Sequence, residues 1–288
     1  MASSDRGAPA GAERRRLLVI GGAERHGAGG AAILRRFVEL AGGANARLVV
    51  IATASSEPDV LEAEYADAFR GFGAGSVTAL RLQDRDDANS DAAIAALDAA
   101  TGVFFTGGDQ VRITTVIGGT RTDSMLQWLV RERRVVLAGT SAGAAMMSST
   151  MIVGGDRSGV TTASVRTGPG LEFLPGVLID MHFAERGRLN RLLSAVALYP
   201  HELGLGIDED TAILADGDRF EVLGSGAVTV VDAGCAGVIQ VPADGDGPIA
   251  LAGARIHVLP AGYTFELTGR CPSIVDAPVG TGERGRVA

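Results

Sequence analysis

Residues 134–143 read RVVLAGTSAG, an aliphatic run that passes directly into a Gly-Thr-Ser-Ala-Gly turn. The aliphatic run has the length and composition of a buried strand, and the small residues after the turn begin a helix. A Gly-x-Ser-x-Gly sequence between a strand and a helix holds its serine on a sharp, exposed turn. The stretch predicts a strand–turn–helix unit with Ser141 as a candidate nucleophile, although the bare pattern also fits a tight structural turn.

Toward the N-terminus of this unit, short aliphatic runs alternate with longer segments of helical periodicity. Such alternation is typical of an α/β protein with a mostly parallel sheet that helices cover on both faces. The expected strands lie at 17–20, 47–52, 76–81, 102–106 and 134–138, and the expected helices at 29–41, 58–71, 90–100 and 110–131.

From about residue 150 the pattern changes. One further helix is predicted at 185–198, and it ends before Pro200. From about residue 211, short strands separated by Asp/Gly turns predict a C-terminal antiparallel β extension of the same domain. These strands are expected at 211–214, 219–223, 227–231, 255–259 and 263–267. We therefore expect one α/β domain over 16–278, between flexible tails at 1–15 and 279–288.

The composition excludes several classes of function. All 26 basic residues are arginines, so a chain without lysine has no Schiff-base lysine and no phosphate-loop lysine. A net charge of −8 argues against a nucleic-acid or anionic-membrane partner. No apolar run is long enough to span a membrane. The two cysteines, Cys235 and Cys271, form neither a disulfide framework nor a metal site. We expect a cytoplasmic protein with no cofactor and no metal.

A glycine-rich loop at 21–30, GGAERHGAGG, follows the first predicted strand. Gly27, Gly29 and Ala32 fit a dinucleotide-binding fingerprint by spacing. The loop is longer than that fingerprint requires, and the second strand ends in Ala-Thr-Ala at 52–54 without the expected ribose-binding acid. These two departures disfavour a nicotinamide oxidoreductase.

A serine nucleophile needs a base, and the chain has four histidines. His26 lies in the glycine-rich loop, His201 follows Pro200, and His257 lies within a late strand pattern. His182 is the best candidate, because it ends the strand-like run 177–180 and precedes an arginine-rich helix.

The segment Gly-Ile-Asp-Glu-Asp at 206–210 offers three candidates for the carboxylate that would orient the base, namely Asp208, Glu209 and Asp210. A solvated acidic turn is the other interpretation of this segment. The order serine, histidine, acid differs from that of α/β-hydrolases, which disfavours an ordinary esterase. The Gly107-Gly108 turn, with the Ala142 N–H, offers donors for an oxyanion, or forms a simple strand-to-helix turn.

Five motifs in combination resemble the cyanophycinases, a serine peptidase family that also contains α-aspartyl dipeptidase. They are FTGGDQ (105–110), GTSAGA (139–144), DMHF (180–183), RGRLNR (186–191) and GIDE (206–209). The resemblance covers about 16–270 and implies a fold like that of class I glutamine amidotransferases. It implies Ser141 as nucleophile, His182 as base and Glu209 as acid, with an oxyanion hole at Gly108 and Ala142. The substrate-pocket positions that it implies are Gln110, Asp180, Met181, Arg186, Arg188 and Arg191.

The resemblance implies a homodimeric exopeptidase that releases β-Asp-Arg dipeptides from cyanophycin, a poly-aspartate that carries arginine on its side chains. The three arginines at 186, 188 and 191 suit substrate carboxylates and Asp180 suits a guanidinium, whereas a solvated basic face is the simpler interpretation. Met181 stands where the family usually has glutamine, which keeps open an aspartyl dipeptidase-like activity on short Asp-containing or isoaspartyl peptides. A non-catalytic binding protein on the same scaffold is the alternative from another class.

Overall fold

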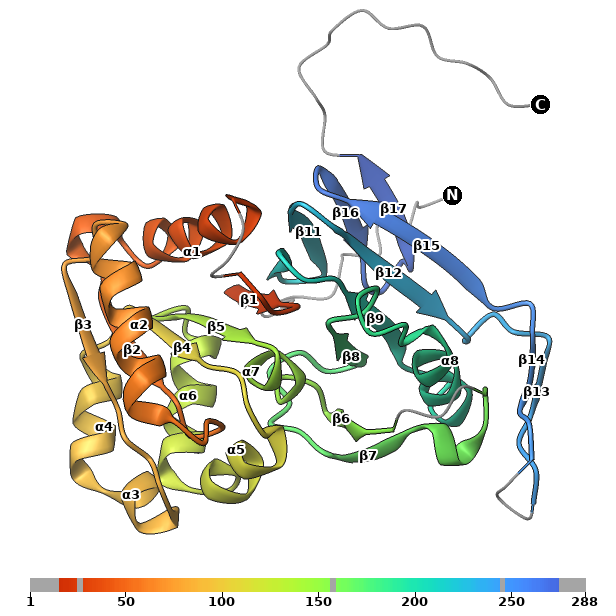
Figure 1. Ribbon diagram of the computed structural model, residues 1–288, viewed down its shortest axis with the longest axis horizontal. Coiled ribbons are helices and arrows are strands. Elements are labelled where there is room, and N and C mark those ends of the chain that lie inside the picture. The colour runs from red at the N-terminus through yellow and green to blue at the C-terminus, as the bar shows by residue number, and fades with distance from the viewer. Residues whose placement is uncertain (1–15, 25–27, 156–158, 244–246, 275–288) are drawn as a thin grey trace, which may run out of the picture.

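The computed structural model describes residues 16–24, 28–155, 159–243 and 247–274. Within them, a nine-stranded sheet and a four-stranded sheet form the framework (Figure 1). The larger sheet has, in spatial order, β17 (Cys271–Ile274), β16 (Tyr263–Glu266), β11 (Arg219–Gly224), β10 (Thr211–Asp216), β1 (Arg16–Ile20), β5 (Val136–Thr140), β4 (Gly102–Phe105), β2 (Arg47–Ile51) and β3 (Ser76–Ala79). The second sheet has β15 (Arg255–Pro260), β12 (Ala227–Asp232), β9 (Leu203–Ile207) and β8 (Val177–Met181).

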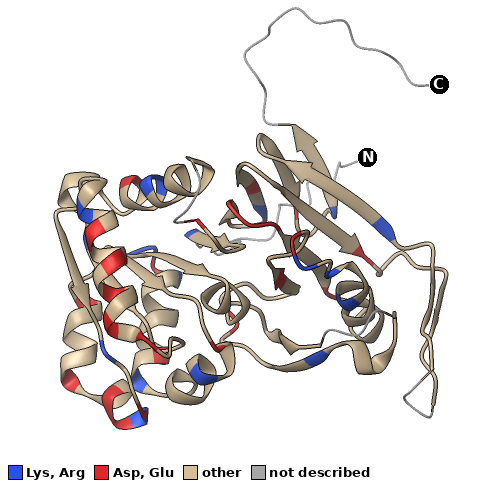
Figure 2. Cartoon of the chain, viewed as in Figure 1, with Lys and Arg blue, Asp and Glu red and all other residues tan. Residues whose placement is uncertain are grey.

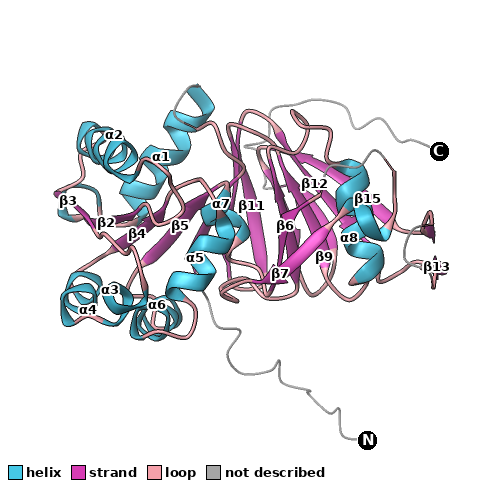
Figure 3. Ribbon diagram, turned by 60° about the horizontal axis from the view of Figure 1, so that its bottom comes forward, coloured by secondary structure: helices cyan, strands magenta, loops and turns pink. Residues whose placement is uncertain are grey.

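Strands β1, β5, β4, β2 and β3 are parallel, and their alternate residues enter two different cores. Val50 packs in the same core as Phe37 and Phe69, whereas Val49 and Ile51 face the opposite layer. Helices α1 (Ala28–Leu40) and α2 (Pro58–Gly71) cover the first face. The other face is covered by α3 (Arg85–Asn89), α4 (Asp91–Asp98), α5 (Gln110–Ile117), α6 (Arg121–Arg131) and α7 (Ala142–Ala145) (Figure 3). The fold is of the α/β class, as predicted.

On the other side of β1, strands β10, β11, β16 and β17 continue the larger sheet in antiparallel order. The second sheet packs on this part, because Val228 and Val230 share a core with Phe220 and Phe265. Its outer face carries α8 (Leu189–Leu198). Of the strands after residue 211, β10, β11, β16 and β17 thus belong to the larger sheet, whereas in the second sheet β12 pairs with β9 and β15 pairs with β12.

Several predicted boundaries were wrong for local reasons. The single helix expected at 110–131 is two helices, α5 and α6, because Gly118-Gly119 interrupts it and Thr120 caps the second. The helix expected at 90–100 is α4, capped by Ser90 and preceded by α3. The helix expected at 185–198 begins only at Leu189, after Gly187 with φ 59°.

The remaining elements are short. Hairpins pair β6 (Thr150–Gly154) with β7 (Arg166–Pro169), and β13 (Val238–Gln240) with β14 (Ala250–Ala252); η1 (Gly43–Asn45) and η2 (Thr162–Ser164) are 3₁₀ turns. Charged residues lie mainly on helices and loops (Figure 2). The predicted tails, 1–15 and 279–288, and His26 lie outside the described residues. Within the part of the chain that the structure describes, no helix has both the length and the hydropathy to cross a membrane.

The buried carboxylate of Glu202 destabilises the fold when it is charged. Glu202 is buried at the start of β9, where Thr150 donates a hydrogen bond to its Oε1 at 2.9 Å. Its Oε2 is buried without a hydrogen-bond partner among the described residues. Burial therefore raises the pKa of Glu202, and the Thr150 hydrogen bond and His201 only partly oppose this effect.

We expect Glu202→Gln to stabilise the protein at pH 7 by on the order of 1 kcal/mol, because it removes a buried charge. A raised folded-state pKa means that the carboxyl favours folding below its unfolded pKa, and that this contribution is lost as the pH rises through the folded pKa. The gain should therefore shrink toward pH 4. Urea denaturation of both proteins at several pH values measures it, with the exposed Glu39→Gln as control. A gain that is equal at all pH values would contradict this interpretation.

Candidate active site

Ser141 lies on a strained turn between β5 and α7. Its backbone is left-handed, with φ 51°, and its N–H donates to the Ile20 carbonyl of β1 at 3.0 Å. The flanking glycines permit this turn sterically. A Cβ on Gly139 would lie 2.2 Å from the Gly143 carbonyl oxygen, and one on Gly143 would lie 2.4 Å from that of Phe105. The turn therefore requires the two glycines of the Gly-x-Ser-x-Gly sequence.

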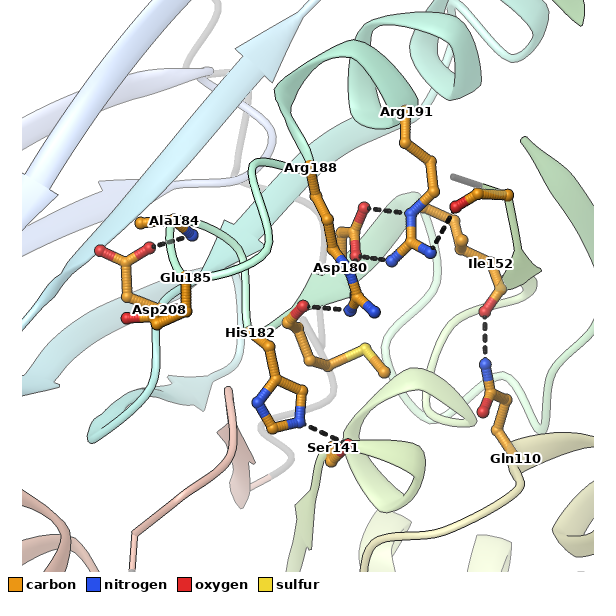
Figure 4. Close-up of polar contacts among 12 residues, drawn as sticks. Gln110, Ser141, Ile152, Asp180, His182, Ala184, Glu185, Arg188, Arg191 and Asp208 are labelled. Atoms are coloured by element: carbon orange, nitrogen blue, oxygen red, sulfur yellow. Dashed lines mark hydrogen bonds and ion pairs between the residues drawn. The ribbon is translucent and has the colours of Figure 1, made fainter. Parts of the chain in front are cut away.

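Three predicted residues meet at the carboxyl ends of strands from both sheets. The Ser141 Oγ lies 3.0 Å from Nε2 of His182, which follows β8 (Figure 4). On the other side of the ring, Nδ1 of His182 lies 2.6 Å from Oε1 of Glu209, which follows β9. The side chain of His182 is 14% exposed and that of Glu209 is 34% exposed. Of the three candidate carboxylates at 208–210, the structure brings Glu209 to the histidine.

The glycine-rich loop after β1 supports the histidine. Gly22 has φ 120°, and a Cβ there would lie 2.3 Å from Cε1 of His182. The carbonyl of Gly21 accepts the His182 N–H, and the carbonyl of Gly22 accepts the Asp210 N–H, both at 2.9 Å. A double glycine directly after the first strand was visible in the sequence, but nothing there indicated that a histidine about 160 residues later would pack on it.

The Gly107-Gly108 turn lies against the serine. A Cβ on Gly107 would lie 3.5 Å from the Cβ of Ser141. Ala142 is the first residue of α7, where an N–H has no intrahelical acceptor. Among the described residues, the N–H of Gly108 has no backbone acceptor either. The two N–H groups predicted to stabilise an oxyanion are thus without a backbone acceptor among the described residues.

The structure places Asp180 and Arg191 differently from the expectation that both would contact substrate. Asp180 has no exposed surface, and its two oxygens accept from Nε of Arg191 at 2.9 Å and from Nη2 of the same guanidinium (Figure 4). Nη1 of Arg191 donates to the Gly155 carbonyl at 3.0 Å. These hydrogen bonds join the buried fork of Asp180 and Arg191 to other groups of the protein, as a buried charge requires.

Among the other residues predicted for the substrate pocket, the arginines and Gln110 retain polar groups that can contact a ligand. Arg188 donates to the Met181 carbonyl and approaches Oδ1 of Asp180 at 3.5 Å. Burial, and after it the charge of Arg191, lower the pKa of Arg188 to about 10. Arg186 is exposed. Gln110 donates one amide hydrogen to the Ile152 carbonyl of β6 at 2.9 Å, and Met181 is buried. The group is electropositive and partly desolvated, which favours an anionic ligand.

Sequence reasoning missed a buried carboxylate behind the serine. Thr140, the residue before Ser141, donates from Oγ1 to Oε2 of Glu24 at 2.6 Å, and the Tyr65 hydroxyl donates to Oε1. Glu24 is 2% exposed, so these contacts fix the end of β5 from inside the protein. No spacing or motif in the loop at 21–30 marks this glutamate as different from a surface residue.

Comparison with known proteins places this geometry in a family. Residues 17–223 match the model of peptidase family S51. The cyanophycinase of Trichormus variabilis is 40% identical over 257 residues, with 88% of this chain and 86% of that protein covered. The cyanophycinase of Synechococcus elongatus is 39% identical over 254 residues, with 87% and 79% covered.

Two solved structures share the fold. A peptidase from an acI-B1 Actinobacterium has a TM-score of 0.66 at 20% identity, and covers 88% of this chain and 98% of its own. A putative peptidase E from Listeria monocytogenes has a TM-score of 0.52 at 14% identity, and covers 73% and 98%. With a family model over most of the chain and relatives near 40% identity, this chain belongs to peptidase family S51 and is a serine-type peptidase.

Proposed function

We propose that this peptidase is an exopeptidase that hydrolyses cyanophycin to β-Asp-Arg dipeptides. The observation that carries the proposal is the continuous hydrogen-bonded chain from Ser141 Oγ through His182 to Glu209. The cyanophycinases among its relatives support this choice of substrate. The strained serine turn at the end of β5, within a parallel sheet, supports the class I glutamine amidotransferase-like fold that the sequence resemblance implies.

In the proposed mechanism, Nε2 of His182 accepts the proton of Ser141 as its Oγ attacks the scissile carbonyl carbon. The carboxylate of Glu209, which contacts Nδ1 of His182, stabilises the imidazolium that forms. The N–H groups of Gly108 and Ala142 stabilise the oxyanion of the tetrahedral intermediate. His182 then returns the proton to the leaving amine, and water hydrolyses the acyl-enzyme by the same route.

Arg186 and Arg188 are proposed to bind the carboxylates of the substrate. Arg188 is partly desolvated beside another cation, so a bound carboxylate would relieve an unfavourable field. Asp180 and Arg191 would act behind it, because their buried fork fixes the strand and the helix from which the pocket is built. Gln110 and Met181 would complete the wall of this pocket.

Ser141→Ala should lower kcat on purified cyanophycin by at least about 10⁴-fold, because it removes the nucleophile. The release of β-Asp-Arg, identified by mass spectrometry, is the measurement. Ser149→Ala, which changes a nearby serine that follows the same short helix, is the matched control and should retain activity. Undiminished release by Ser141→Ala would contradict the mechanism.

The buried Arg191 and the exposed Arg186 should respond differently to substitution. Arg191→Met leaves Asp180 buried without its partner, and should lower the free energy of unfolding by about 3–5 kcal/mol. Arg186→Gln should leave stability unchanged and raise KM about tenfold, because it removes an exposed carboxylate-binding group. Urea denaturation and steady-state kinetics measure the two effects, with the exposed Arg36→Gln as control. Equal loss of stability in both variants would refute the distinction.

An aspartyl dipeptidase-like activity is the second candidate, and Met181 favours it. A thioether cannot donate the hydrogen bonds of the glutamine amide that the family usually has at this position. Cleavage of short Asp-containing or isoaspartyl peptides, with no release from cyanophycin, would establish this alternative in the same mass assay.

We also propose a cytoplasmic homodimer. The free thiols of Cys235 and Cys271 suit a reducing compartment. Strand β15 lies at the edge of the second sheet and exposes Ile256 by 50% and Val258 by 63%. An apolar edge strand of this kind is suited to pair with a second copy.

Val258→Glu should convert the dimer to a monomer at micromolar concentration, because it places a charge on this edge. Light scattering after size-exclusion chromatography measures the mass. Val60→Glu, which changes a similarly exposed valine on α2, is the control and should leave the mass unchanged. A monomeric wild-type protein would refute the dimer.

A further inference from the structure

The contact between His182 and Glu209 joins two separate loops. His182 begins the loop that follows β8, and Glu209 lies in the turn that follows β9. The Glu209 side chain is 34% exposed, and among the described residues its carboxylate has only His182 as a hydrogen-bond partner. Burial therefore does not fix this carboxylate, and its position must come from the way in which the two loops are held together.

The two loops are connected by reciprocal carboxylate-to-backbone hydrogen bonds. Oδ1 of Asp208, on the acid's turn, accepts the Ala184 N–H of the histidine loop at 3.1 Å. In the opposite direction, Oε2 of Glu185, on the histidine loop, accepts the backbone N–H of Glu209 at 3.2 Å. Each loop thus supplies an acceptor to the other, and one of the two bonds ends on Glu209 itself.

Asp208 also anchors this arrangement to the second sheet. Its Oδ2 accepts the Ala227 N–H at the start of β12 at 3.0 Å. Burial and the nearby charge of Glu185 raise the pKa of Asp208, whereas these two backbone hydrogen bonds lower it. Burial and a neighbouring negative charge both disfavour a carboxylate at this position. Its hydrogen bonds to the two backbone N–H groups offset this cost, which indicates that they have a structural role.

Neither side chain lies on the side of the reacting atoms. In Figure 4, Glu185 and Asp208 lie beyond His182, on the side away from Ser141. They are therefore in a position to act on the histidine–glutamate pair, and not on a substrate carbonyl bound at the serine.

We propose that Glu185 and Asp208 are positioning residues that hold Glu209 against Nδ1 of His182 by clamping the two loops to each other. The proposal rests on the proposed function only in taking Ser141, His182 and Glu209 as the catalytic set. When the Glu185 acceptor is lost, Glu209 moves away from the ring for part of the time. The imidazolium that forms as the serine attacks then loses its neighbouring anion, and the serine becomes less reactive.

Two measurements that need no peptide substrate test this clamp. The first is the rate at which phenylmethanesulfonyl fluoride inactivates the serine. The second is the low-field NMR signal of the proton between Nδ1 of His182 and Glu209, assigned by its absence in His182→Gln. We expect Glu185→Ala to lower the inactivation rate about tenfold, as for the loss of one hydrogen bond to a charged group. We also expect it to weaken this NMR signal.

Glu185→Gln separates a hydrogen-bond acceptor from a charge. Its amide oxygen can accept the same Glu209 N–H, so reactivity within about threefold of wild type is expected. Asp84→Ala is the matched control, because Oδ1 of Asp84 accepts the N–H groups of Asp86 and Asp87 at 2.9 Å at the start of α3. It should lose stability only, with the Nδ1 proton signal of His182 unchanged.

The clamp is overturned if Glu185→Ala keeps both the wild-type inactivation rate and the wild-type Nδ1 proton signal of His182. It is also overturned if Glu185→Gln is as impaired as Glu185→Ala, since a charge and not an acceptor would then be responsible. If Glu185→Ala does not fold, Asp208→Asn decides, because its amide nitrogen cannot accept one of the two N–H groups. Failure to cleave cyanophycin would refute the proposed function, while these two measurements would still decide the clamp.

Discussion

The hydrogen bond between Ser141 and His182 joins the nine-stranded sheet to the four-stranded sheet. The serine follows β5 of the larger sheet, whereas the histidine and Glu209 follow β8 and β9 of the second sheet. A distance of 3.0 Å between Oγ and Nε2 is therefore set by how one sheet packs on the other. The valines of β12 and the phenylalanines of β11 and β16 form that packing, so the core between the sheets fixes the catalytic geometry.

A costly backbone conformation occurs at the proposed nucleophile and base, and at the residue after the proposed acid. Ser141, His182 and Asp210 all have φ near 50°, a conformation that L residues adopt at a cost. All three follow strands within three residues, and their N–H groups donate to the carbonyls of Ile20, Gly21 and Gly22, respectively, which holds them there. The strain is thus concentrated at the sheet edge, where the side chains must leave the strands to meet one another.

The α/β class, the serine turn, the histidine and the acidic turn could all be predicted from the sequence. Each depends on a local pattern of one strand and the few residues after it. The division of the late strands between two sheets could not, because Val228, Val230 and Val231 are all buried and their pattern does not identify the neighbouring strands. The pairing of Asp180 with Arg191 could not be predicted from the sequence either. Substrate binding and internal pairing require the same chemistry, and only burial distinguishes them. Glu24, Glu185 and Asp208 act through contacts that carry no spacing signal.

The pairing of strand β1 limits the order in which the chain can fold. Its last residues and the following glycines receive backbone hydrogen bonds from Ser141, His182 and Asp210. Its antiparallel partner is β10, with Arg16 opposite Asp216. Strand β1 thus waits for a partner made about 200 residues later, a long-range pairing that slows folding. A nascent chain that already contains the serine and the histidine still lacks Glu209 and β10, so the proposed triad is assembled only after these residues have left the ribosome.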